Sequence, residues 1–209
     1  MYKKYFKRLL DFISSFLMIV LLSWLFIVIA IIIKLTSNGK VFYCQKRKGK
    51  DKKDFNILKF RTMKESTPGD VPTHLLENPE QYITGIGKVL RKFSLDELPQ
   101  LFNILKGDMS LVGPRPALWN QYDLLKERDI NYSNTVRPGL TGWAQVNGRD
   151  EIPIPIKARY DGEYVEKMSF RFDLMCILKT VGCVVKHEGV REGISKGPET
   201  IEKSVDSWG

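Results

Sequence analysis

An apolar stretch near the N-terminus, Phe16 to Ile33, constrains this chain more than any other feature of the sequence. Its only interruption by a small polar residue is Ser23. With a rise of about 1.5 Å per residue, a helix of this length reaches across most of a hydrocarbon core about 30 Å thick. We therefore expect this stretch to lie in a membrane.

Basic residues flank the apolar stretch on both sides. They are Lys3, Lys4, Lys7 and Arg8 before it, and Lys34, Lys40, Lys46, Arg47 and Lys48 after it. A spanning helix normally keeps Lys and Arg on the cytoplasmic side, so two basic flanks favour a helix that enters and leaves by the same face. An ordinary single span stays open as an alternative. A cleaved signal peptide is disfavoured because no small-x-small cleavage site follows.

The positive charge of the chain is concentrated next to the apolar stretch. The net charge is +9, but residues 1–53 hold twelve Lys and Arg against Asp11 and Asp51, which leaves −1 for the rest. A nucleic-acid-binding protein carries its basic excess over the folded domain, whereas basic residues beside an apolar helix meet anionic lipid headgroups. This distribution predicts membrane lipids, and no nucleic acid, as partners.

The cysteine content indicates a reducing compartment. Cys44, Cys176 and Cys183 are an odd number without metal-ligand spacing, so no disulfide framework is expected. We therefore expect the protein at the cytoplasmic face of its membrane.

The pattern along the chain predicts an α/β fold, mostly helical, with a short β-hairpin. The elements expected are a helix over 2–35, strands at Val41–Gln45 and Phe55–Phe60, a polar loop from Glu65 to Glu80, and helices at Gly85–Lys92, Asp96–Leu105 and Asp173–Lys186.

The segment Ser94–Gln100 places two carboxylates, Asp96 and Glu97, side by side at a helix start. The start is inferred from Pro99, because proline is tolerated in a first helical turn and not further in. Helix capping explains the same residues: Ser94 with Glu97 fits a capping box, and Asp96 fits an N-cap.

Two further polar segments suggest a ligand site. Lys106–Pro116 places Arg115 between two prolines, and a guanidinium held in this way suits phosphate oxygens. The segment Val136–Arg149 is rich in Gly, amides and Arg, and loops of this composition approach ligands closely. Each segment alone also fits an ordinary turn, but three in one small domain favour a site.

Four motifs together resemble the bacterial sugar transferase family, the small monotopic phosphoglycosyl transferases. They are Lys59–Met63, Ser94–Gln100, Gly113–Pro116 and Arg137–Arg149, and the resemblance covers about Lys7 to Gly193. It implies an enzyme that moves a sugar 1-phosphate from a UDP-sugar to undecaprenyl phosphate at the cytoplasmic face, the first membrane step of glycan assembly. It also implies a re-entrant membrane helix in 1–38, a catalytic domain in 39–193 and a polar tail in 194–209.

The resemblance also implies roles for individual residues. Asp96 is expected to attack the β-phosphorus, forming a covalent phosphosugar-aspartyl intermediate and releasing UMP, with Glu97 and Asp96 as ligands of Mg²⁺. Both nucleophiles are anions at neutral pH, so neither displacement needs a general base, and we expect no catalytic role for His74 or His187.

Cationic and polar side chains are expected to bind the diphosphate. The candidates are Lys59, Arg91, Arg115 and Arg149, with Arg137, Gln145 and Asn147 as weaker ones that either bind the nucleotide or hold their loop. Asp173 also matches a family position, although an N-cap of the last helix explains it equally well.

The sequence departs from the family in its membrane helix. The family places Ser-Pro in mid-helix, where proline bends the chain back, whereas this chain has Ser23-Trp24. A break here must come from the Ser23 hydroxyl or from tertiary packing, or not occur at all. We predict a re-entrant helix with a weaker intrinsic kink.

Two other functions stay open: an inactive relative that serves as a membrane scaffold, and a hydrolase of nucleotide sugars. A second copy of the chain and later glycosyltransferases are open as partners. The identity of the sugar is not encoded in any recognisable stretch.

Overall fold

The computed structural model describes residues 2–67, 79–148 and 152–186. Its helices are α1 (Lys7–Leu21), α2 (Ser23–Thr36), α3 (Gly85–Lys92), α4 (Gln100–Lys106), α5 (Tyr122–Ile130), α6 (Trp143–Val146), α7 (Ile154–Lys167) and α8 (Phe170–Lys186). Its strands are β1 (Phe42–Lys48), β2 (Asp54–Phe60), β3 (Ser110–Val112), β4 (Ala117–Leu118) and β5 (Gly139–Thr141). The mixed, mostly helical fold is the predicted one.

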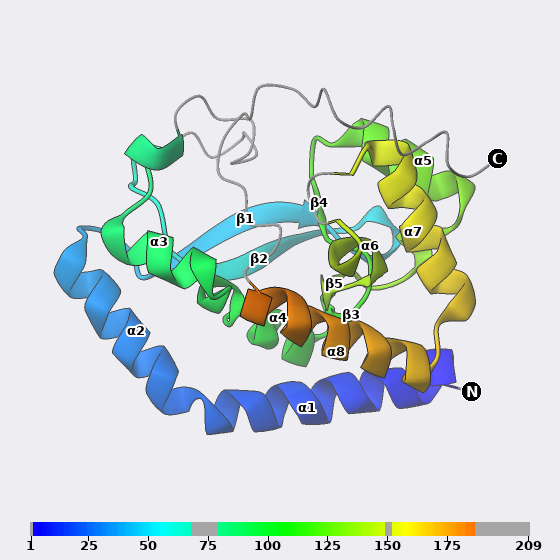
Figure 1. The fold of residues 1–209 in the computed structure, drawn as a ribbon, viewed down its shortest axis with the longest axis horizontal. Coiled ribbons are helices and arrows are strands. Elements are labelled where there is room, and N and C mark those ends of the chain that lie inside the picture. The colour runs from blue at the N-terminus through cyan, green and yellow to red at the C-terminus, as the bar shows by residue number, and fades with distance from the viewer. Residues whose placement is uncertain (1, 68–78, 149–151, 187–209) are drawn as a thin grey trace.

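The two N-terminal helices are bent relative to each other by 61°. In Figure 1, α1 runs along the lower edge of the molecule and α2 turns upward from its end. The break lies at Leu22, with φ −94° and ψ 6°, next to the Ser23-Trp24 pair considered from the sequence, so the helix predicted over 2–35 consists of two helices. Ser23 and Trp24 follow directly after the break, and α2 begins at Ser23.

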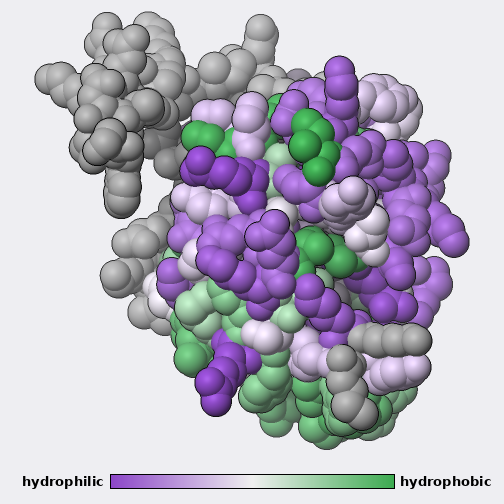
Figure 2. Space-filling view, turned by 90° about the vertical axis from the view of Figure 1, so that its right-hand side faces the viewer, coloured by the Kyte–Doolittle hydropathy of each residue, from purple (hydrophilic) through white to green (hydrophobic). Residues whose placement is uncertain are grey.

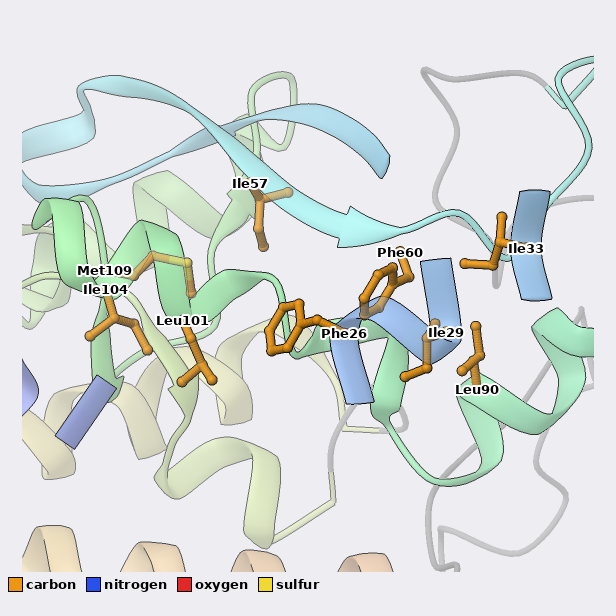
Figure 3. Packing of buried hydrophobic residues seen from close by; sticks show 9 residues of the cluster. All are labelled: Phe26, Ile29, Ile33, Ile57, Phe60, Leu90, Leu101, Ile104 and Met109. Carbon is orange, nitrogen blue, oxygen red and sulfur yellow. The ribbon is translucent and has the colours of Figure 1, made fainter. Parts of the chain in front are cut away.

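Apolar packing fixes α2 on the domain. Phe26 packs against Phe60 of β2, with ring centroids 5.6 Å apart, and against Phe102, at 5.7 Å. Ile29 and Ile33 are buried in the same cluster as Leu90 of α3 and residues of α4 (Figure 3). Burial of each such side chain stabilises the fold by about 1.5–3 kcal/mol.

Polar side chains fix α1 on another part of the domain. The Asp11 carboxylate accepts hydrogen bonds from Ser110 Oγ, at 2.7 Å, and from the Leu111 N–H, at 3.0 Å. Lys7 Nζ lies 2.7 Å from Asp173 Oδ2 in a nearly buried ion pair. Because α1 and α2 dock at different places, tertiary packing accounts for the bend without a proline.

Asp173 is not the N-cap of the last helix, so this interpretation of its sequence position is wrong. It lies inside α8 and also accepts hydrogen bonds from the hydroxyls of Tyr2, at 2.6 Å, and Tyr164, at 2.8 Å. The capping group of α8 is Ser169, whose Oγ accepts from the Phe172 N–H at 3.3 Å.

The outer face of the bent pair is apolar and exposed. Its exposed side chains include Leu9, Phe12, Ile13, Phe16, Leu17, Val20, Leu21, Trp24, Ile27 and Ile31. Figure 2 shows apolar residues gathered along the lower edge, where α1 lies in Figure 1, beneath a hydrophilic upper part. Within the described ranges no single helix is long and apolar enough to cross a membrane; by length and composition only the bent pair qualifies.

The hairpin predicted from the sequence is confirmed, with longer strands than expected. β1 and β2 pair antiparallel from Phe42 opposite Phe60 to Lys48 opposite Asp54, and β4 adds to the other edge of β1. A second, parallel pair of β3 and β5 was not predicted from the sequence.

The short helix α4 is held at its middle and at its C-terminal end. At its middle, Asn103 bonds the free edge of β2: its Oδ1 accepts from the Leu58 N–H at 2.9 Å, and its Nδ2 donates to the Asn56 carbonyl at 2.8 Å. At its C-terminal end, Arg8 donates to two carbonyls, Ile104 at 2.6 Å and Leu105 at 2.8 Å. The Arg8 bonds satisfy carbonyls that a helix end leaves unpaired, and the Asn103 bonds satisfy backbone groups at the edge of β2.

We predict that Lys7→Met lowers the free energy of unfolding by about 3 kcal/mol, because it leaves the Asp173 carboxylate buried without its cation. Thermal unfolding in detergent measures the change. Adding Asp173→Asn to Lys7→Met should recover part of the loss. A single variant as stable as wild type would show that the pair does not hold α1 on the domain.

Candidate active site

The two adjacent carboxylates lie on a tight turn between α3 and α4. Ser94 adopts the left-handed conformation, with φ 55° and ψ 23°, and a 3₁₀ turn covers Leu95–Glu97 before α4 begins at Gln100. The Ser94 side chain makes no capping hydrogen bond, so the capping box considered from the sequence is not formed. The helix expected over Asp96–Leu105 is correspondingly split into a 3₁₀ turn and α4.

Asp96 is buried, with 8% of its surface exposed, among charged neighbours. Burial is the largest influence and raises the pKa of its carboxyl group above the ordinary value. The positive charge of Lys59 opposes this rise, the negative charge of Glu97 adds to it, and Arg91 and Arg115 oppose it more weakly. The surrounding cations thus favour the ionised form that burial disfavours.

Glu97 takes the direct ion pairs. Its Oε1 lies 2.7 Å from Lys59 Nζ and 3.4 Å from Arg115 Nη2. Lys59 comes from β2 and Arg115 from the loop between β3 and β4, so segments far apart in the sequence meet at this carboxylate.

Arg91 reaches the site from α3. Its Nε donates to Thr62 Oγ1 at 2.9 Å. The helix can pack this closely only because residue 87 is glycine: a Cβ there would lie 2.1 Å from the Thr62 carbonyl oxygen. Thr84 caps the helix by accepting from the Gly87 N–H at 3.0 Å.

Arg47 is a site-supporting residue that the sequence interpretation missed. Its Nη1 donates to the Pro116 carbonyl at 3.0 Å, and its strand pairs with β4 directly after the Arg115 loop. From the sequence, Arg47 counted only as part of the basic flank of the apolar stretch. No local pattern indicates a bond to a residue so distant in the chain.

The structure brings together Asp96, Glu97, Lys59, Arg91 and Arg115 as expected. The three weaker candidates instead bond to nearby backbone carbonyls: Arg137 Nε to Gly107 at 2.8 Å, Gln145 Nε2 to Leu140 at 3.0 Å, and Asn147 Nδ2 to Trp143 at 2.7 Å. Of the two roles considered for them, these bonds support holding the backbone.

Three residues interpreted from the sequence, Arg149, His74 and His187, lie outside the described residues, as do the polar tail and most of the loop Glu65–Glu80.

The donor set suits a metal ion that shares its ligands with a substrate. Nowhere in the described ranges do three or more His, Cys, Asp or Glu side chains gather to hold a metal. Asp96 and Glu97 supply two adjacent carboxylates, and Mg²⁺ is usually bound by one or two carboxylates together with substrate phosphates and water.

Comparison with known proteins matches the bacterial sugar transferase model to residues 2–187. The chain belongs to the bacterial sugar transferase family. This membership confirms the family expected from the four motifs and the expectation that the chain is a phosphosugar transferase.

Two of three similar proteins have names that state an activity. The exopolysaccharide production protein ExoY of Rhizobium meliloti is 36% identical over 197 residues, covering 88% of this chain and 87% of ExoY. The UDP-glucose:undecaprenyl-phosphate glucose-1-phosphate transferase of Escherichia coli is 39% identical over 183 residues, covering 84% of this chain but 39% of the relative. A UDP-N-acetylgalactosamine-undecaprenyl-phosphate N-acetylgalactosaminephosphotransferase of Aeromonas hydrophila is 38% identical over 191 residues, covering 88% and 45% respectively. The chain thus spans less than half of the two relatives whose names state an activity.

We predict that Lys59→Met shifts the acidic limb of the pH profile of kcat/KM to higher pH. If Asp96 acts as an ionised carboxylate, as expected from the sequence, activity should fall as the pH drops through its pKa, and loss of the cation that most opposes the rise should raise that pKa further. The measurement is substrate turnover across pH. Lys52→Met, which removes a surface cation paired with Asp129, is the matched control and should leave the limb in place. An unmoved limb in Lys59→Met would contradict the assignment of Asp96 as the titrating group.

Proposed function

We propose that this protein transfers a sugar 1-phosphate from a UDP-sugar to undecaprenyl phosphate through a phosphosugar-aspartyl intermediate on Asp96. The observation that carries the proposal is that two adjacent carboxylates differ in their ion pairs. Glu97 is bound by Lys59 and Arg115, whereas no ion pair or hydrogen bond from the described residues engages the Asp96 carboxylate. The named activities of the Escherichia coli and Aeromonas hydrophila relatives support the general reaction.

In the first step a carboxylate oxygen of Asp96 attacks the β-phosphorus of the UDP-sugar. The bond from this phosphorus to the bridging oxygen breaks, and UMP leaves with the electron pair. In the second step a phosphate oxygen of undecaprenyl phosphate attacks the same phosphorus, and the Asp96 oxygen leaves. Both attacking groups are anions, so no proton has to be removed, which fits a site without histidine among its described members.

The cationic side chains of the site stabilise the negative charge of the reacting phosphoryl group. Lys59, Arg91 and Arg115 all act on Asp96 electrostatically, so they also surround a phosphoryl group bound to it. Charges fixed in place stabilise the transition state without reorganisation. Asp96 and Glu97 are the residues that would hold Mg²⁺. When bound, the ion supplies further positive charge to the diphosphate.

We also propose that α1 and α2 form a re-entrant membrane segment at the cytoplasmic face. Both arms dock on one domain: α1 through Asp11 and Lys7, and α2 through Phe26. The two ends of the apolar segment therefore belong on one side of the bilayer, in agreement with the basic flanks. The exposed apolar outer face of the bend supports insertion into lipid.

To test the reaction, we would incubate the solubilised protein with Mg²⁺ and a panel of UDP-sugars, with and without undecaprenyl phosphate, and measure UMP. We expect one UMP per protein without acceptor, a matching gain of sugar phosphate in the intact protein mass, and turnover only with acceptor. Asp96→Asn should reduce turnover by more than about 1,000-fold. It should keep its thermal stability, because a neutral amide does not carry the burial penalty of the ionised carboxylate.

The other outcomes separate the alternatives. UMP in excess of protein without acceptor indicates a hydrolase, and no UMP with any sugar indicates a scaffold. Undiminished turnover in Asp96→Asn would contradict the role of Asp96 as the nucleophile. Undiminished turnover in excess chelator would contradict the requirement for a metal ion.

Membrane topology is tested with Lys3→Cys and the native, exposed Cys44, which flank the bent pair. We predict that a membrane-impermeant maleimide added to intact cells labels neither residue, and that both react after lysis. A single span would place the two residues on opposite faces, so labelling of only one of them before lysis would contradict the re-entrant arrangement.

A further inference from the structure

Two amide side chains are buried on α4, and their bonding differs. Asn103 is 7% exposed, and both its oxygen and its nitrogen bond to the edge of β2. Gln100 is 2% exposed, and its buried Nε2 finds no acceptor in the parts of the chain that the structure describes. A buried donor without a partner is destabilising and uncommon in native proteins, so this one calls for a physical reason.

The contacts on either side of Gln100 show where it faces. Three residues before it, Glu97 pairs with Lys59 of β2; three residues after it, Asn103 bonds to Leu58 of the same strand. The backbone between them is helical, with the Leu101 N–H donating to the Leu98 carbonyl at 3.0 Å. Residues three apart on helical backbone share a face, so Gln100 faces β2 beside the Asp96 and Glu97 pair.

The chemistry of the amide suits a phosphate at this position. Three cations already surround Asp96, and a further cation would repel them, whereas an amide N–H adds a hydrogen bond without adding charge. Hydrogen bonds to a charged acceptor are also stronger than those between neutral groups.

We propose that Gln100 is a further substrate-binding residue, whose Nε2 donates a hydrogen bond to a phosphoryl oxygen of the diphosphate bound at Asp96 and Glu97. This assignment rests on the proposed function, since it takes the diphosphate as the ligand. The unpaired amide of the ligand-free protein gains its acceptor when the diphosphate arrives.

The test uses UDP with Mg²⁺ as the probe and the full-length protein in detergent. Gln100→Met, which keeps an unbranched side chain of similar length, should weaken UDP binding by about 10- to 100-fold in calorimetry. Its melting temperature without ligand should stay unchanged or rise, because the variant removes an unpaired buried donor. Asn103→Leu is the matched control: it removes the paired amide one turn further along and should lower the melting temperature.

A third variant fixes the direction of the hydrogen bond. Gln100→Glu replaces the donor by a carboxylate, which repels a phosphate, so at neutral pH it should bind UDP no better than Gln100→Met. Retained UDP affinity in either Gln100 variant would overturn the proposal, as would a fall in the melting temperature of Gln100→Met as large as that of Asn103→Leu.

These results are distinguishable from failure of the proposed function. A wild-type protein that binds UDP and releases no UMP from any UDP-sugar contradicts the transferase reaction but leaves the comparison of UDP affinities intact. A wild-type protein that does not bind UDP contradicts the Gln100 assignment as well.

Discussion

The fold depends on the burial of charged side chains from a helix whose other face is apolar. Lys7 and Asp11 of α1 are both nearly buried, and such groups are tolerated only when their partners are in place. Those partners come from α8 and from the start of β3, so the N-terminal helix and two remote parts of the chain have to assemble together. Once α1 is seated, Arg8 reaches the carbonyl end of α4. The position of the turn that carries Asp96 and Glu97 follows from this, because α4 is its direct continuation.

The two carboxylates of the site differ in their ion-pair partners. Asn103 bonds the edge of β2 to α4, and this contact places Lys59 of β2 beside Glu97. The same cations act on Asp96 electrostatically without a direct ion pair among the described residues, so its charge is balanced at longer range. Two residues adjacent in the sequence thus have different electrostatic surroundings.

Local patterns predicted the elements whose determinants are local. The helix over Gly85–Lys92 was predicted at its observed bounds, and the hairpin was predicted from its β-prone runs and charged turn. The break at Leu22 lies beside the Ser23-Trp24 pair considered from the sequence, but its 61° angle and the 3₁₀ turn before α4 were not predicted, since tertiary contacts set them. Ser94 misled the interpretation because it fits a capping box, yet its left-handed backbone ends α3 instead.

The site was predicted through motifs of the family more than through physics. Spacing alone was also consistent with an ordinary turn at Arg115 and with helix capping by Asp96 and Glu97. The supporting bonds of Asn103 and Arg47 join residues 45 and 69 positions apart, and no short pattern encodes such pairings. Polar residues in the loop after Val136 looked equally suited to a ligand, but Arg137, Gln145 and Asn147 bond to backbone carbonyls.

The 61° bend has a consequence for biogenesis if α1 and α2 lie in the bilayer as proposed. The apolar pair leaves the ribosome before the domain that holds its two arms, and at that stage nothing on the later chain prevents it from straightening. Straightening after folding requires the loss of the Lys7 ion pair or of the Phe26 packing. The topology of the segment would then be decided during synthesis, by a competition between membrane insertion and the folding of residues that emerge later.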